Sequence, residues 1–196
     1  MQVSTAVLFV PLSLVMLCAC AGPIYRISGF DVRSDLAHLD YTDTANCRPS
    51  LLELMWDRSF GATTSNSYYL YTGEKVDNVL VNRVKLLEGA AYAIDRLPMP
   101  ICENVPKATV TLLGVTHRHH VSPDINADYV SAQVTLLAKV ECATHEGGDY
   151  DLYTGRSPKS KAGFWSSTDG IQAALTKSSS EAAVMALLEV LKQCGK

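Results

Sequence analysis

The start of this sequence lacks charge: none of its first 19 residues is Asp, Glu, Lys or Arg. Within this stretch, Ala6 to Leu17 form an apolar run that is too short to cross about 30 Å of hydrocarbon as a helix. No second apolar run of membrane-spanning length follows. A short apolar run followed by small residues is typical of an export signal, so we expect residues 1–19 to be cleaved and exclude them from the fold.

Several patterns that carry chemistry are also missing. The net charge is −3 and the chain has no block of Lys and Arg, which makes nucleic acid a poor partner. No G-x-S-x-G elbow is present, and no Cys-x-x-Cys pair supports a zinc ribbon or a thioredoxin-like redox site. The run Ser178 to Ser180 fits a helix start better than a nucleophile. We therefore predict no catalytic residues, no cofactor and no metal.

Six cysteines are nevertheless present, and they form two groups. Cys18 and Cys20 close the apolar run. The others lie far apart in the rest of the chain, at Cys47, Cys102, Cys142 and Cys194. Four such cysteines in an oxidising compartment predict two structural disulfides, for which three pairings exist.

The tetrapeptide Leu17-Cys18-Ala19-Cys20 resembles the lipobox of bacterial lipoproteins. The resemblance implies that Cys20 carries a diacylglyceryl thioether and becomes the acylated N-terminus of the remaining 196 − 19 = 177 residues. Several acyl chains at one site anchor a protein more durably than a single chain does. Ala21, where Asp would retain the protein at the inner membrane, implies an outer-membrane location. The alternative is an ordinary cleaved signal with cysteines nearby by chance.

Sequence periodicity predicts the elements of the mature chain. We expect a lipidated tether over residues 20–30 and one domain over residues 31–196. Apolar residues at three- and four-residue steps predict a helix from Glu74 to Leu97, ended by Pro98. Strand composition marks Tyr68 to Tyr71, and Leu51 to Trp56 fits a short helix or a strand. The polar stretches 31–49, 61–67 and 157–163 are expected to be loops.

The strongest strand pattern lies in the second half of the chain. Val130 to Cys142 alternates apolar and polar residues over thirteen positions. Lys107 to His120 is expected to form a strand with a bulge or a bend at Gly114, and Tyr150 to Gly155 should return after a Gly turn as a hairpin partner. Ser178-x-x-Glu181 fits a capping box at the start of the last helix.

These elements predict an α+β domain of two layers. A mainly antiparallel sheet with a long C-terminal hairpin is covered by two amphipathic helices on one face. Cys142 and Cys194 lie on apolar faces that pack together in such a domain. We therefore predict the pair Cys142–Cys194 and, by default, the pair Cys47–Cys102.

One cluster could carry chemistry: His117-Arg118-His119-His120. His117 and His119 share a face of a strand and could ligate a metal through neutral imidazoles, with Asp124 as a loose third ligand. This would make the protein a metal-dependent envelope factor or enzyme. Polar residues that face water at a strand end explain the run equally well.

The tyrosines and the order of the expected elements both indicate what kind of partner the protein binds. Tyrosines gather near expected strand ends, where aromatic side chains are common both in protein interfaces and in ordinary sheets: Tyr68, Tyr69, Tyr71, Tyr150 and Tyr153.

The second half of the chain is similar in plan to YajG-like lipoproteins and to lipopolysaccharide-assembly-type lipoproteins of the outer membrane. The shared features are the long strand, the Gly turn, the segment Tyr153 to Ser157 and the closing helix. The resemblance implies a periplasm-facing domain with no transferable site residue besides Cys20.

Together these observations predict a non-catalytic accessory lipoprotein. It would be held to the membrane by its N-terminal lipid and would bind another envelope protein within a transport or secretion assembly. The alternative is a binding module that holds a small envelope ligand, such as a lipid, a glycan or a peptidoglycan fragment, between sheet and helix.

Overall fold

The computed structural model describes residues 24–31, 36–40, 45–60, 63–69, 75–123, 128–143, 148–163 and 168–194. Cys18, Cys20, Asp124 and Tyr71 lie outside these ranges, and so the predictions made for them are not examined by the structure. Among the described residues, no helix has both the length and the apolar character needed to cross a membrane.

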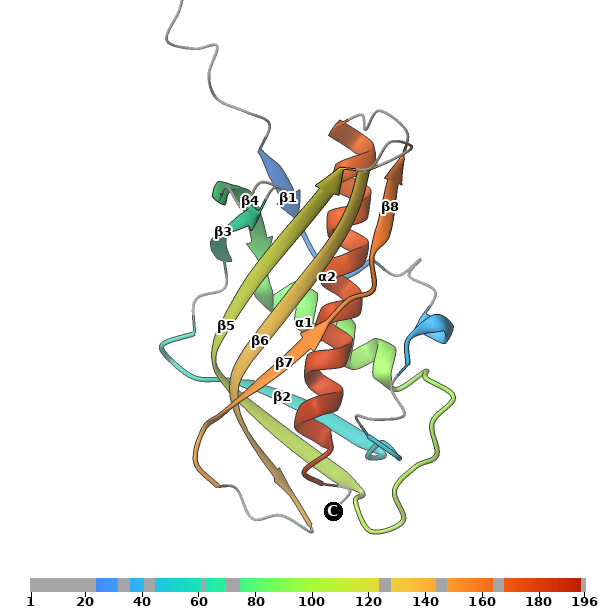
Figure 1. Cartoon of the computed structure of the whole chain (residues 1–196). Helices are drawn as coiled ribbons and strands as arrows, with labels where there is room; N and C mark the ends of the chain where they lie inside the picture. Colours follow the sequence, from blue (N-terminus) through green and yellow to red (C-terminus); the bar gives the residue numbers. More distant parts are fainter. Residues whose placement is uncertain are drawn as a thin grey trace, which may run out of the picture.

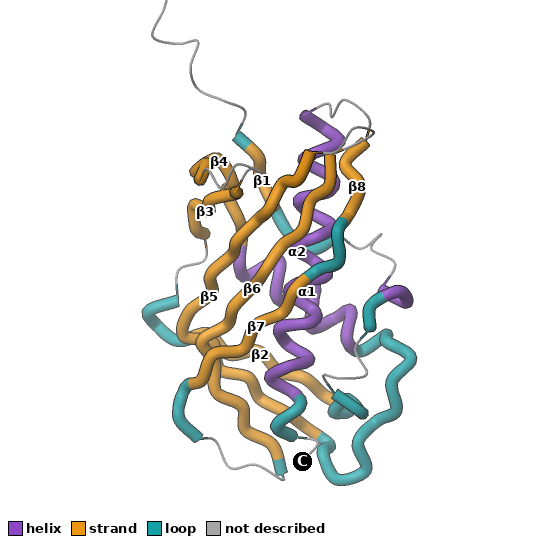
Figure 2. Tube along the Cα trace, in the orientation of Figure 1, coloured by secondary structure: helices purple, strands orange, loops and turns teal. Residues whose placement is uncertain are grey.

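Two long strands, β5 (Lys107–Pro123) and β6 (Asp128–Cys142), form the antiparallel ladder at the centre of the sheet. Figures 1 and 2 show them running side by side along almost the whole length of the domain. On β6, every second residue from Val130 to Val140 is buried, and the residues between them are partly exposed. The prediction of a long strand with one wet face is confirmed.

The register of this ladder shifts between Leu112 and Gly114, where the bulge was predicted. Before the shift, the even-numbered residues of β5 are buried; after it, the odd-numbered residues from Val115 to Val121 are buried. One extra residue in a strand turns all following side chains to the opposite face. The bulge therefore decides which residues of the His117 to His120 cluster enter the core.

The sheet is mixed, with the strand order β1-β4-β3-β5-β6-β7 and with β2 and β8 added beside β5 and β6. Parallel pairing joins β1 to β4, β2 to β5 and β3 to β5, whereas the other pairs are antiparallel. The remaining strands are β1 (Tyr25–Ile27), β2 (Leu51–Trp56), β3 (Thr63–Tyr69), β4 (Lys75–Asn82), β7 (Asp151–Arg156) and β8 (Ser160–Gly163). The predicted α+β class is confirmed.

Two stretches expected to be loops are strands. β3 contains most of 61–67, and β8 lies in 157–163. Both are rich in Ser, Thr or Lys, so their own composition favours a loop. Pairing with β4 and β6 supplies the backbone hydrogen bonds that make them strands. The stretch 31–49 contains a single 3-10 turn, η3 (Leu36–His38).

The helix expected from Glu74 to Leu97 is wrong in its first half. Residues Lys75–Asn82 form β4, and α1 covers only Arg83–Ile94. Val79 and Val81 are both fully buried, which is the period of a strand rather than of a helix. The side chain of Asn82 accepts a hydrogen bond from the Lys85 N–H at 3.1 Å, so this residue caps the helix and fixes its start.

The last helix, α2 (Thr168–Leu191), starts ten residues before the predicted capping box, so Ser178 lies in its middle. Seven consecutive residues, Ser178 to Val184, are fully buried. Because a helical turn has only 3.6 residues, this part of α2 has no exposed face and is not amphipathic. The helix packs on β6, β7 and β8, and α1 packs against α2 and also contacts β2, β3 and β4.

Two disulfides join Cys47 to Cys102 and Cys142 to Cys194, which are the two pairs that the sequence analysis predicts. Their Cα atoms are 5.1 and 6.0 Å apart. The first ties the segment before β2 to the loop before β5, and the second ties the end of β6 to the end of α2. Each closes a loop of more than 50 residues, for which chain entropy gives about 4 kcal/mol of stabilisation.

Gly155 on β7 provides a direct test of how closely α2 sits on the sheet. A Cβ at this position would lie 2.1 Å from the Ala186 nitrogen and 2.2 Å from the Ala182 oxygen, both of which are backbone atoms of α2. We expect Gly155→Ala to lower the free energy of unfolding by about 3 kcal/mol, because helix and strand must separate. Gly148→Ala, where nothing lies within 4 Å, should change it by less than about 0.5 kcal/mol. Urea unfolding of both variants checks this, and equal stabilities would contradict the packing.

Candidate functional site

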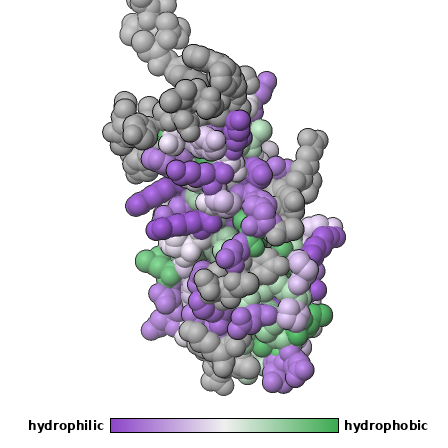
Figure 3. Space-filling model, turned by 45° about the vertical axis from the view of Figure 1, so that its right-hand side comes forward, coloured by the Kyte–Doolittle hydropathy of each residue, from purple (hydrophilic) through white to green (hydrophobic). Residues whose placement is uncertain are grey.

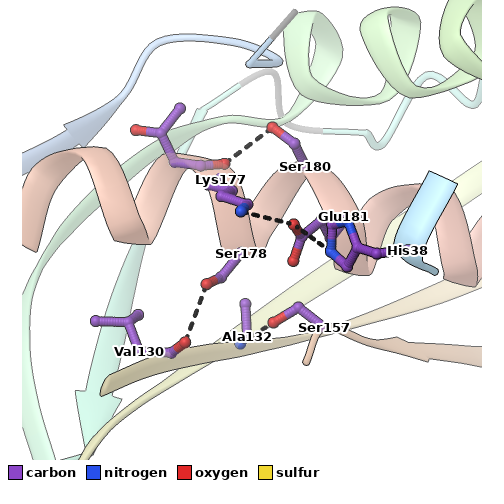
Figure 4. A network of polar contacts seen from close by, with 9 residues as sticks. His38, Val130, Ala132, Ser157, Lys177, Ser178, Ser180 and Glu181 are labelled. Atoms are coloured by element: carbon purple, nitrogen blue, oxygen red, sulfur yellow. Dashed lines mark hydrogen bonds and ion pairs between the residues drawn. The ribbon is translucent and has the colours of Figure 1, made fainter. Parts of the chain in front are cut away.

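Four consecutive polar residues in the buried part of α2, Ser178 to Glu181, each contact a different part of the protein. Figure 4 shows three of them, Ser178, Ser180 and Glu181. Ser178 Oγ donates to the Val130 carbonyl of β6 at 3.2 Å. Ser180 Oγ accepts from the Asp31 N–H at 2.8 Å and donates to the carbonyl of Thr176 at 2.9 Å. Because successive helical residues point about 100° apart, the four side chains form a polar ring around α2.

Glu181 is the only acid among the residues described as fully buried, and it has one charged neighbour in η3 and one within α2. Its Oε1 lies 3.2 Å from His38 Nε2 of η3 and 3.8 Å from Lys177 Nζ, one turn earlier (Figure 4). Neither carboxylate oxygen accepts a well-aligned hydrogen bond. Burial raises the pKa of Glu181 above its usual value, and the charges of Lys177 and His38 oppose this change. The contact holds the segment around η3 against α2.

Ser179, the remaining member of the ring, faces the sheet and lies 2.7 Å from His119 Nε2. Both side chains are fully buried, so this Ser–His contact is closed to substrates and acts as a packing contact. Burial lowers the pKa of His119 to about 4, which keeps the ring neutral at physiological pH.

His117 lies beside His119 on the buried face of β5, as their spacing predicts. The two rings are stacked with centroids 6.3 Å apart and planes 13° apart. Burial lowers the pKa of His117 well below its usual value, and the nearby charges of His119 and Arg83 add to the effect. Neither ring nitrogen of His117 has a hydrogen-bond partner among the described residues.

This geometry does not favour the metal site considered for the cluster. The lone pairs of an imidazole lie in its ring plane, so two stacked rings direct them along parallel lines rather than toward one ion. The described residues contain no group of three or more His, Cys, Asp or Glu that could hold a metal. Asp124, the loose third candidate, lies outside the described residues.

Arg118 and His120 point the other way, to the outer face of the sheet, and line a groove of about 450 Å³ there. Arg118 on β5 is the register neighbour of Gln133 on β6, which is the register neighbour of Arg156 on β7. His120 lies beside Ser131 in the next row. Hydrophilic side chains cover most of the face shown in Figure 3, and apolar side chains form only small patches.

The groove is held in shape at one end by Ser157. Its Oγ accepts from the Ala132 N–H, and its own N–H donates to the Ala132 carbonyl, each at 2.9 Å. These bonds extend the β6–β7 ladder beyond Arg156. Sequence reasoning found the histidine cluster but missed Gln133 and Arg156, because nothing in the sequence says which residues face each other across strands.

The structure places the tyrosines less favourably for binding than their sequence positions suggest. Tyr153 is partly buried and packs against the core, where burial raises its pKa above the usual value. Tyr150 is partly exposed. Tyr68 and Tyr69 lie on β3, but their side chains are not described, and Tyr71 lies outside the described residues. The most exposed aromatic residue described is Tyr92 on α1, whose ring stacks against the Arg96 guanidinium.

Comparison with known proteins gives little further guidance. No protein-family model matches the chain, and no curated protein matches it in sequence. A solved structure described only as a crystal structure of an uncharacterized protein aligns with 71% of this chain and 88% of its own, at 13% identity and a TM-score of 0.31. A likeness of this size carries no argument about function.

The buried histidine predicts how stability depends on pH. Because the pKa of His119 is about 4 in the folded protein and about 6.5 in an unfolded chain, the unfolded state binds more protons between these values. His119 alone therefore makes the folded state about 3 kcal/mol less stable at pH 4 than at pH 7. Glu181, whose pKa is raised, changes the stability in the opposite direction as the pH falls. The contribution of His119 is therefore measured by comparing variants.

We expect the double variant His119→Leu/Ser179→Ala to lose about 3 kcal/mol less than the wild type between pH 7 and pH 4. Removing both partners leaves no buried hydroxyl without its hydrogen bond. His120→Leu, which changes an exposed ring on the same strand, serves as the control. Urea unfolding at several pH values checks this. Identical pH profiles for the wild type and the double variant would contradict a neutral buried His119.

Proposed function

We propose that this protein is an exported, lipid-anchored domain that works without catalysis and binds another protein of the bacterial cell envelope. In this proposal residues 1–19 are removed, Cys20 carries the lipid, and the domain faces the periplasm from the outer membrane. The plan shared with YajG-like lipoproteins fits this location. The role would be that of an accessory subunit in a transport or secretion assembly.

The observation that carries the proposal is the distribution of the six cysteines. All four cysteines of the folded domain are used in the two disulfides. Disulfides of this structural kind persist in oxidising compartments and are rare in the bacterial cytoplasm. The two cysteines that remain, Cys18 and Cys20, both belong to the lipobox-like tetrapeptide. Export to an oxidising compartment would explain the four disulfide cysteines, and acylation next to a cleaved signal would explain Cys18 and Cys20.

The position of β1 supports a close attachment. Tyr25 begins β1 five residues after Cys20, and five extended residues span at most about 18 Å. An acylated Cys20 would therefore keep the β1 end of the domain near the membrane surface. Figure 1 shows β1 and the chain's C-terminus at opposite ends of the domain. The C-terminal end, where β2 lies, would face away from the membrane.

Strand β2 is the surface that best fits a protein partner. It pairs with β5 on one side, and no strand pairs with its other side among the described residues. Leu51 and Met55 on its outer face are 49% and 54% exposed. An open strand edge with apolar side chains invites pairing with another chain, which is how many domains bind extended peptide segments.

The alternative, a small ligand held between sheet and helix, gains no support from the packing. The sheet residues beneath α2 and the helix residues above them are fully buried, including Val134, Leu136 and Leu187. Gly155 brings the strand backbone into contact with the helix backbone. A lipid, glycan or peptidoglycan fragment would need a place outside this interface.

The anchor is tested by two matched substitutions. We expect Cys20→Ala to abolish labelling with radioactive palmitate and to release the protein from membranes, because the acylated atom is removed. Cys18→Ala should leave both unchanged, because this residue leaves with the signal. Membrane sedimentation and autoradiography of both variants check the prediction. Continued labelling of Cys20→Ala would overturn the lipid-anchored reading.

The partner surface is tested by photo-cross-linking in cells. A photoreactive amino acid at Met55 should capture one envelope protein in stoichiometric yield, because the open edge of β2 is the proposed contact. The same substitution at Leu152, an even more exposed apolar residue on β7, is the control and should capture nothing specific. Cross-links at Leu152 but not at Met55 would move the interface to the opposite edge of the sheet and contradict the role of β2.

A further inference from the structure

The groove on the outer face of the sheet is lined by cationic and neutral polar side chains. Two arginines flank one glutamine in a single row across β5, β6 and β7, and His120 and Ser131 occupy the next row. The outward-facing residues of β5 from Gly114 to Ser122 and of β6 from Tyr129 to Leu137 include no acid. The groove therefore offers hydrogen-bond donors and positive charge without a carboxylate to satisfy them.

Two other cations on the same face, both nearer the start of β5, are paired with carboxylates. Lys107 Nζ lies 2.7 Å from Glu53, and Lys139 Nζ lies 2.9 Å from Glu141. By contrast, neither Arg118 nor Arg156 pairs with a carboxylate in the part of the chain that the structure describes. Among the described residues, the outer face thus pairs Lys107 and Lys139 with carboxylates and leaves the guanidinium groups of Arg118 and Arg156 without one.

The spacing of the two arginines suits a single small anion. Adjacent strands lie about 4.8 Å apart, so Arg118 and Arg156, two strands apart, have Cα atoms about 10 Å from each other. Side chains of this length can converge above Gln133, which lies between them. A guanidinium binds an oxyanion through two parallel hydrogen bonds. A phosphate monoester carries about two negative charges and three acceptor oxygens, so it matches two guanidinium groups better than a carboxylate, which has one charge and two oxygens.

We propose that the groove lined by Arg118, Gln133 and Arg156 binds the phosphate group of an anionic ligand. Arg118 and Arg156 hold the phosphate oxygens from two sides. The Gln133 amide donates from below, and His120 and Ser131 border the position of the group that carries the phosphate. The site depends on the groove alone, and so it is independent of the lipid anchor and of the β2 edge. The phosphate can belong to a soluble metabolite or to a phospholipid headgroup.

The test uses the full-length protein in a neutral detergent, labelled for NMR detection of the arginine Nε–Hε groups. Inorganic phosphate should shift the signals of Arg118 and Arg156 saturably, with a dissociation constant of about 1 mM or less. Arg118→Gln and Arg156→Gln should each weaken binding by about tenfold or more, since each removes charge-assisted hydrogen bonds. Gln133→Glu, which places a carboxylate between the arginines, should abolish it.

A matched control separates a site from general screening. Lys85→Gln removes the same charge from α1, which packs on the opposite side of α2 from the groove. Its binding should stay within about twofold of the wild type. Thermal unfolding of each variant should match the wild type, because the substituted side chains are exposed or half-exposed on the sheet surface.

Two further titrations identify the source of the phosphate. Glycerol 3-phosphate stands for a soluble ligand, and phosphatidic acid in the detergent micelle stands for a headgroup, because both carry a phosphate monoester. Tighter binding of either one supports the site and assigns its source. Absence of saturable shifts with all three phosphate probes would overturn the proposal. Equal weakening in Lys85→Gln, or an acetate affinity equal to that of phosphate, would overturn it as well.

Discussion

Helix α2 has no exposed face over the two turns from Ser178 to Val184, and the rest of the domain is built around that constraint. A polar side chain buried without a partner costs several times what a hydrogen bond gains. Each member of the polar ring therefore needs a partner from a different direction. The sheet supplies the Val130 carbonyl and His119, the N-terminal segment supplies the Asp31 N–H, and η3 supplies His38. The ring fixes the rotation of α2 about its axis as well as its position.

The bulge after Leu112 connects this ring to the outer groove. Without the extra residue, Arg118 and His120 would point into the core and His117 and His119 into water. The guanidinium group of Arg118 and the polar ring of His120 could not be buried there without partners. With the bulge, His119 reaches Ser179 while Arg118 reaches the row of Gln133 and Arg156. One irregularity in one strand thus creates both the closed histidine pair and the open cationic surface.

The sequence predicts features that follow from a repeating pattern within one element. It does not predict features that depend on residues of another element. The alternation of Val130 to Cys142, the bulge at Gly114 and the α+β class were predictable because each is written in local periodicity. The Asn82 cap was hidden by apolar residues that fit a helix and a strand equally well. The Ser178-x-x-Glu181 pattern was misleading, because buried partners in other elements, rather than the helix terminus, satisfy those side chains. The Arg118–Gln133–Arg156 row depends on strand register, which no single segment contains.

The two disulfides act at the places where this design is weakest. A helix that needs partners on all sides loses them together if one end separates from the sheet, and Cys142–Cys194 joins the end of β6 to the end of α2. The segment that carries β2 has an open edge and partly exposed side chains, and Cys47–Cys102 ties its start to the loop before β5. In the proposed periplasmic location, no ATP-dependent chaperone would refold a chain that opens. Disulfides that restrict the unfolded chain then keep a domain with a buried polar ring folded. In the proposed lipoprotein, pairing of these four cysteines leaves Cys20 available for the lipid.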